Sequence, residues 1–247
     1  MRLKLGRIVN IDVFLHWTFI LAPIYLVYEW RWQKNLPWST VAILFGLLMA
    51  AFASVLMHEF GHALMARWFG VETKDIIITP IGGLARLEGM PKKAFEELLI
   101  TVAGPLVNLV IASLIAVYLA ISGSNWLPSD GFEGLTEIPV VLMWMNIALF
   151  LFNLVPAFPM DGGRILRSGL SMVLGHRTAT LAAGSLGMVL AIGFAMTGLV
   201  IKQYPFMLIG GFVFLAALYE MRSPNNQVQP GDIPANHDLA SDSQRLQ

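Results

Sequence analysis

The chain lacks cysteine and carries little charge: of its 247 residues, 13% are charged and 56% are hydrophobic. The absence of thiols excludes disulfides and thiolate metal sites, so any metal ion must be bound by His, Asp or Glu. The shortage of charge excludes an ordinary soluble domain, in which about 25% of residues are charged. These absences favour a polytopic membrane protein that is surrounded by the lipid bilayer.

The chain also has no excess of charge of either sign, because 16 basic residues balance 16 acidic ones. The basic side chains form no dense patch with interleaved aromatic residues, the pattern typical of nucleic-acid binding. We therefore expect no nucleic-acid partner. The sequence carries no indication of the oligomeric state.

Long apolar runs, by contrast, make up most of the chain. A helix of about 20 residues crosses a hydrocarbon core of about 30 Å. The expected spans are Val13–Tyr28, Trp38–Met57, Leu98–Ile121, Ile138–Met160, Thr178–Ile201 and Gln203–Tyr219. No small-residue cleavage site follows the first run, so we interpret it as a retained helix rather than a signal peptide. The sequence thus predicts an all-α polytopic membrane protein with about six transmembrane helices.

Lys and Arg are distributed unevenly among the connecting segments. With the N-terminus in the cytoplasm, 13 of them lie on the cytoplasmic side, and only Arg31, Lys34 and Lys202 lie outside. Because cytoplasmic loops are enriched in Lys and Arg, this distribution predicts a multi-pass cell-membrane protein with both termini in the cytoplasm. The second and fourth spans then both end on the cytoplasmic side.

Two segments differ in kind from the spans. Within Val71–Glu88, the β-branched run Asp75–Thr79 and the turn residues Pro80–Gly83 predict a short cytoplasmic β-hairpin or sheet between the second and third helices. Residues 223–247 are polar and are predicted to form a disordered cytoplasmic tail. Residues 1–222 then form one membrane domain.

A metal-binding motif follows the second uncharged run. His58 and His62 form an H-E-x-x-H pattern, so both imidazoles lie on one helix face and can bind one Zn²⁺. Glu59 lies beside them as a candidate general base, which would take a proton from the attacking water and deliver it to the leaving amine. A chance match to this motif at a membrane span is rare, which favours a metal site.

A catalytic zinc site needs a third protein ligand, and Asp161 is the candidate. Pro156 and Pro159 interrupt the fourth span, and Gly162-Gly163 permits a sharp turn, so the carboxylate can face the histidines. Asp161 can alternatively be a capping residue at the membrane surface. Asn153 is a candidate hydrogen-bond donor to the substrate backbone or the developing oxyanion, but it can equally join two helices.

Taken together, these motifs resemble those of the site-2 protease family of intramembrane zinc metalloproteases. The matching elements are His58-Glu59-Phe60-Gly61-His62, Pro80-Ile81-Gly82-Gly83, Gly104-Pro105-Leu106-Val107-Asn108, Asn153-Leu154-Val155-Pro156 and Asp161-Gly162-Gly163. The resemblance covers about residues 5–220. Asn108, in the third of these elements, is interpreted as a helix-packing residue or as a support for a metal ligand.

The resemblance implies one zinc ion per chain, with His58, His62 and Asp161 as ligands and Glu59 as the base. The implied function is that of a zinc-dependent intramembrane endopeptidase, which cuts a transmembrane helix of another membrane protein. The predicted hairpin would offer an edge to which the unwound substrate adds as a strand. Because no insertion of PDZ size and no CBS pair is found within these residues, we expect a compact form of the family, without PDZ or CBS domains.

Other functions share some of these features. A membrane zinc transporter also carries intramembrane His and Asp, but it would need several staged metal sites rather than ligands in one layer. A prenyl-protein peptidase shares the H-E-x-x-H motif but ordinarily takes a Glu as its third ligand. A catalytically inactive binding homologue is the remaining alternative, and the intact Glu59 argues against it.

Overall fold

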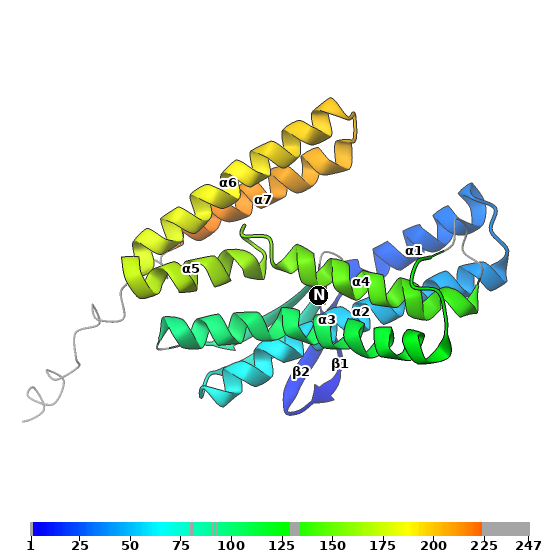
Figure 1. Ribbon diagram of the computed structural model, residues 1–247, viewed down its shortest axis with the longest axis horizontal. Coiled ribbons are helices and arrows are strands. Elements are labelled where there is room, and N and C mark those ends of the chain that lie inside the picture. The colour runs from blue at the N-terminus through cyan, green and yellow to red at the C-terminus, as the bar shows by residue number, and fades with distance from the viewer. Residues whose placement is uncertain (1, 80–81, 90, 92, 129–133, 224–247) are drawn as a thin grey trace, which may run out of the picture. The chain divides into compact units, whose positions relative to one another are not determined.

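The computed structural model describes residues 2–79, 82–89, 91, 93–128 and 134–223 (Figure 1). Its contacts divide the chain into two compact units, Met1–Pro156 with Met160–Ile165, and Ala157–Pro159 with Leu166–Gln247. Of the predicted tail, all but Ser223 lies outside the described residues. The single membrane domain over residues 1–222 stays a prediction.

Three of the helices in the first unit pack side by side. They are α2 (Trp38–Trp68), α3 (Ala94–Ser122) and α4 (Ile138–Asn153). Helix α3 packs against both α2 and α4, and Ala112, with 3% exposure, lies in the apolar core between α3 and α4. All three helices, together with α6 and α7 below, are long and apolar enough to cross a membrane. The chain is a multi-pass membrane protein.

The first predicted span is not one helix. Strand β2 (Ile11–His16) occupies its beginning, followed by a short 3-10 helix at Trp17–Ile20, helix α1 (Leu21–Tyr28) and a π-helical turn at Glu29–Gln33. The apolar run therefore begins with a strand, in which buried and partly buried residues alternate at the start. Among the described residues, five helices meet the length and hydropathy required of a membrane span, where six were predicted.

The predicted hairpin belongs to a four-stranded sheet. Strands β3 (Glu72–Thr79) and β4 (Gly82–Glu88) pair as predicted, while β1 (Arg2–Ile8) and β2 extend the sheet in the order β1-β2-β3-β4. The predicted turn residues 80 and 81 lie outside the described part of the chain. Strand β2 runs parallel to β3, and α2 covers the sheet with Ala63 against Ile76. Strand β4 is an edge strand.

The fourth predicted span ends earlier than expected. Helix α4 stops at Asn153, and irregular backbone leads to α5 (Asp161–Leu174), which the sequence analysis did not predict. Pro156 and Pro159 have no backbone N–H to donate, so the helix cannot continue through them. Helix α5 escaped notice because Arg and Ser residues interrupt its apolar pattern.

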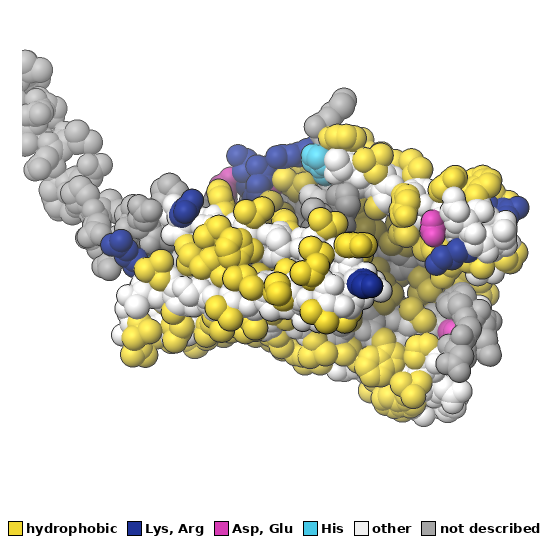
Figure 2. All heavy atoms as spheres, turned by 90° about the horizontal axis from the view of Figure 1, so that it is seen from above, with side chains coloured by type: hydrophobic (Ala, Val, Ile, Leu, Met, Phe, Trp, Pro, Cys, Tyr) yellow, Lys and Arg dark blue, Asp and Glu magenta, His cyan; other side chains and the backbone are white. Residues whose placement is uncertain are grey.

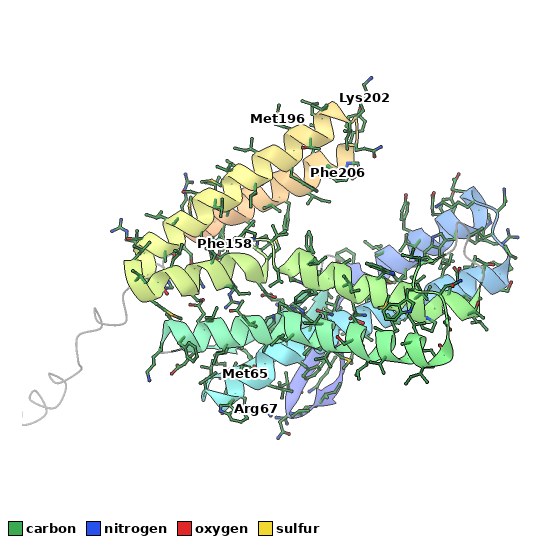
Figure 3. All side chains as sticks on the ribbon, in the orientation of Figure 1. Met65, Arg67, Phe158, Met196, Lys202 and Phe206 are labelled. Atoms are coloured by element: carbon green, nitrogen blue, oxygen red, sulfur yellow. The ribbon has the colours of Figure 1, made fainter. Side chains whose placement is uncertain are left out.

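The second unit contains an antiparallel hairpin of α6 (His176–Val200) and α7 (Tyr204–Arg222). Lys202 lies in its short connection, as predicted, with Met196 and Phe206 nearby (Figure 3). The face in Figure 2 is dominated by hydrophobic side chains, with Lys and Arg in a few places. Such a surface is suited to contact with lipid.

Candidate metal centre

Three ligand-type side chains meet inside the first unit. His58 and His62 come from α2 and Asp161 is the first residue of α5, and all three are buried. The Oδ2 atom of Asp161 lies 3.0 Å from His58 Nε2 and 3.2 Å from His62 Nε2, and the two Nε2 atoms are 3.1 Å apart. A tetrahedral zinc with bonds of about 2.0 Å separates its ligand atoms by about 3.3 Å.

The outer nitrogens of both imidazoles face acceptors. His62 Nδ1 donates to the backbone oxygen of Ile100 at 2.8 Å, and His58 Nδ1 donates to Asn108 Oδ1 at 2.6 Å. A neutral imidazole whose Nδ1 carries the proton presents a lone pair at Nε2. Three electron-rich atoms therefore converge, and a cation between them removes their mutual repulsion. The residues present fit a zinc ion.

The backbone near Asp161 is shaped by a close approach at Gly162. A Cβ atom at Gly162 would lie 2.3 Å from the backbone oxygen of Val155 and 2.4 Å from that of Leu154. Only glycine permits this contact, which brings the start of α5 against the end of α4. The helix N-terminus also favours a carboxylate in its first turn.

A second glycine makes room for the imidazoles. A Cβ atom at Gly104 on α3 would lie 2.2 Å from His62 Nε2 and 2.8 Å from His58 Nε2. On the facing side of α2, a Cβ at Gly61 would lie 2.7 Å from the backbone oxygen of Ala103. The two glycines let α2 and α3 approach closely at the level of the metal ligands. Both glycines lie within the sequence motifs, but the motifs alone do not predict this contact.

Glu59 faces the sheet. Its carboxylate accepts a hydrogen bond from the backbone N–H of Ala85 on β4 at 2.9 Å. A Cβ at Gly83 would lie 2.4 Å from Glu59 Cγ, so glycine is required for the glutamate to lie there. The predicted base is thus held by a hydrogen bond from the edge strand β4.

Two asparagines on α4 differ in their surroundings. The side-chain amide of Asn153 donates to the backbone oxygen of Leu149 in its own helix, at 3.0 Å. Asn146, fully buried, also donates to a backbone oxygen of its own helix, that of Leu142, but it bonds to Asn108 on α3 as well. Asn153 was predicted as a site residue and Asn146 was not, although an isolated amide inside an apolar run itself indicates a buried polar contact.

Residues 46–200 match peptidase family M50, a range that includes all the residues of the candidate metal centre. The chain belongs to peptidase family M50. The zinc metalloprotease MJ0392 of Methanocaldococcus jannaschii is 37% identical over 220 residues, which are 89% of this chain and 60% of that protein. A putative zinc metalloprotease of Synechocystis, sll0528, is 32% identical over 74% of this chain and 48% of its own length.

A solved structure resembles this M50 member as well. The site-2 protease from Methanocaldococcus jannaschii superposes with a TM-score of 0.64 at 34% identity, covering 90% of this chain and 96% of that one. The predicted membership of the site-2 protease family is confirmed. This chain spans between about half and three fifths of the length of these two relatives and of a putative zinc metalloprotease of Mycobacterium tuberculosis, Rip3.

Proposed function

We propose that this M50 member is a zinc-dependent endopeptidase that cuts a peptide bond within or near a transmembrane helix of a membrane-protein substrate. The observation that carries the proposal is the convergence of His58, His62 and Asp161, whose ligand atoms lie 3.0–3.2 Å apart inside the first unit. These side chains would hold one zinc ion per chain. The names of the relatives, zinc metalloprotease and site-2 protease, support this activity.

Zinc, when bound, polarises the scissile carbonyl and lowers the pKa of water towards about 7. Glu59 then takes a proton from the attacking water and returns it to the leaving amine. In this proposal its carboxylate leaves the N–H of Ala85 as it turns towards the metal centre. The side-chain amide of Asn153 would break its hydrogen bond to the backbone oxygen of Leu149. It would then donate to the substrate backbone or to the developing oxyanion.

The substrate is proposed to bind by adding a strand to β4. Strand β4 pairs only with β3 in the described sheet, and the N–H of Ala85 points away from that partner towards Glu59. A substrate carbonyl can replace the carboxylate on this N–H, so substrate binding and release of the base would occur together. A peptide must unwind locally before it can pair in this way.

Backbone methylation of a model transmembrane peptide tests strand addition. If the substrate pairs with β4, N-methyl groups at successive positions near the cleavage site should reduce turnover at every second residue, because strand hydrogen bonds alternate. A uniform effect along the peptide would contradict strand addition. This experiment avoids changing Gly83, where any side chain would displace Glu59.

The orientation of the chain is proposed from its charge distribution, with both termini and the β-sheet in the cytoplasm. Because the chain has no cysteine, single cysteines introduced by Lys74→Cys and Lys202→Cys can be labelled selectively. A membrane-impermeant thiol reagent added to intact cells should label Lys202→Cys and leave Lys74→Cys unmodified. Labelling of both variants, or of Lys74→Cys alone, would refute this orientation.

The central experiment compares Glu59→Gln with Asp161→Ala in reconstituted protein, with cleavage and bound zinc measured on the same samples. Glu59→Gln should keep zinc and lose cleavage, whereas Asp161→Ala should lose most of both. Normal cleavage by Glu59→Gln would refute the role of the base. Wild-type protein that binds zinc without cleaving would favour an inactive homologue, and net zinc uptake into vesicles would favour a transporter.

A further inference from the structure

A chain of buried polar groups extends from His58 across three helices. Asn108 on α3 accepts from His58 Nδ1 at 2.6 Å, and its Nδ2 donates to Asn146 Oδ1 on α4 at 3.0 Å. Asn146 Nδ2 in turn donates to Ser54 Oγ on α2 at 3.2 Å. Both asparagines are 0% exposed and Ser54 is 5% exposed. We call Asn108, Asn146 and Ser54 the amide relay.

The direction of each hydrogen bond in the amide relay is set by backbone oxygens at its far end. Asn146 Nδ2 donates to the backbone oxygen of Leu142 at 2.9 Å, and the Ser54 hydroxyl donates to that of Ala50 at 3.1 Å. A carbonyl oxygen can only accept, so Asn146 must turn its Oδ1 towards Asn108. Asn108 must then offer its Nδ2 to Asn146.

The amide of Asn108 consequently has only one orientation available, with Oδ1 facing His58. A rotated amide would present Nδ2 to His58 Nδ1 and stabilise the imidazole with its proton on Nε2. That imidazole could not bind a metal ion through Nε2. His62 needs no such support, because its Nδ1 donates to the backbone oxygen of Ile100, which cannot rotate.

We propose that Asn146 is a positioning residue of the metal centre, which fixes the Asn108 amide and thereby the imidazole form of His58 that binds zinc. The inference rests on the proposed metal centre, but not on the cleaved substrate. Asn146 contacts neither the ligands nor the substrate in this role. It acts on the zinc affinity through Asn108.

Zinc affinity measured by chelator competition on the full chain in detergent tests this role. Loss of an outer hydrogen-bond partner typically weakens metal binding about 10- to 100-fold, and Asn146→Leu should lose this much. Asn108→Leu should lose at least as much. The double variant Asn108→Leu/Asn146→Leu should be no weaker than Asn108→Leu alone, because both act through the same imidazole.

A conservative substitution separates positioning from packing. Asn108→Asp keeps an oxygen for His58 Nδ1, so its zinc affinity should stay within about threefold of wild type, as in the carboxylate–histidine–zinc arrangement. If Asn108 acted only through packing, Asn108→Asp should bind zinc more weakly than Asn108→Leu, because a buried carboxylate would disturb the helices more than Leu. Thr101→Val is the matched control, since this buried hydroxyl on α3 donates to Glu97 in its own helix.

Wild-type zinc affinity in Asn146→Leu, additive losses in the double variant, or an Asn108→Asp variant as weak as Asn108→Leu would each overturn the inference. If Asn146→Leu does not fold, Asn146→Ala adds no volume and carries the same expectation. Wild-type protein that binds no zinc would instead refute the metal centre itself. The two failures are therefore distinguishable.

Discussion

The two helical regions of the molecule bury different kinds of side chain. Between α2, α3 and α4, and at the start of α5, the buried residues include a set of polar groups that bond to one another. They are Ser54, His58, His62, Asn108, Asn146 and Asp161. The hairpin of α6 and α7 is closed mainly by small apolar residues. They are Ala179, Ala183, Gly184, Ala191, Gly198, Gly210 and Ala217.

The hairpin shows how small residues let two helices pack closely. Gly210 on α7 has no room for a side chain, because a Cβ would lie 2.7 Å from the backbone oxygen of Ala191. Close backbone contact of this kind associates membrane helices without polar groups. The second unit also buries polar side chains, among them Arg167, which donates to Glu220 on α7. Among the described residues, the group of ligand-type side chains close enough to hold a metal ion lies in the first region, and this convergence indicates chemistry.

Removal of zinc should give the largest difference in hydrogen exchange between the two regions. A ligand at 1,000 times its Kd stabilises the state that binds it by about 4 kcal/mol. Chelation should therefore raise hydrogen exchange in the segments around His58 and Asp161 and leave the α6–α7 hairpin unchanged. Exchange measured by mass spectrometry on zinc-loaded and chelated samples checks this. Equal loss of protection in both regions would contradict the comparison.

Gly104→Ala should have the next largest effect, because its Cβ would lie 2.2 Å from His62 Nε2. The imidazoles must move, and zinc affinity should fall by about 100-fold or more. Gly46→Ala on α2, where a Cβ meets nothing within 4 Å, is the control and should bind zinc normally. Chelator competition compares the two variants. Normal zinc binding by Gly104→Ala would show that the site tolerates a wider spacing of α2 and α3.

Gly210→Ala addresses the hairpin in the same manner. Its Cβ would lie 2.8 Å from the Cβ of Ala195, and overpacking of this kind typically costs about 1–3 kcal/mol. Hydrogen exchange in α6 and α7 should increase while zinc affinity stays at the wild-type value. Gly211→Ala, whose Cβ meets nothing within 4 Å, is the neighbouring control. If Gly210→Ala loses zinc affinity and Gly211→Ala does not, the two regions are not separable.

The smallest effect is expected in the sheet. The hydrogen bond from Arg86, followed by the charge of that guanidinium, holds the pKa of Asp75 below its usual value. Asp75 therefore stabilises the sheet above about pH 4, its usual pKa, and this contribution is lost as the pH falls through the lowered pKa.

Exchange rates in β3 and β4 measure this contribution. At neutral pH, Asp75→Asn should increase them by about two- to fivefold, as expected for a partly exposed ion pair. The difference between variant and wild type should vanish in acid. A difference that persists below the lowered pKa would assign the effect to packing of Asp75 rather than to its charge.

Local patterns allowed much of this molecule to be predicted from sequence. The uncharged runs correspond to α2, α3, α6 and α7 with ends within a few residues, except that α2 continues through the metal-binding motif to Trp68. His58 and His62 share a helix face because of their spacing alone. The position of Asp161 could be anticipated because prolines and glycines around it interrupt the helix.

Contacts between distant segments could not be predicted in this way. Strand β2 has one partner, β1, directly before it, but its other partner, β3, lies some 60 residues later, and its apolar residues continue into the helical segment that follows. The sequence therefore predicts a span where the structure has a strand. The hydrogen bond of Glu59 to Ala85 depends on the same sheet. Asn146 carries no motif, and its importance follows only from the position of Asn108 on another helix.

The parallel pairing of β2 with β3 constrains how the chain passes through the bilayer. Both strands belong to one sheet and must lie on the same side of the membrane. Helix α2 lies between them and, with 31 residues, is about 46 Å long, enough to cross once. A path that begins and ends on one side crosses an even number of times. If α2 crosses the bilayer once, residues 17–37, although broken into three short helical pieces, must make a second passage opposite in direction to that of α2.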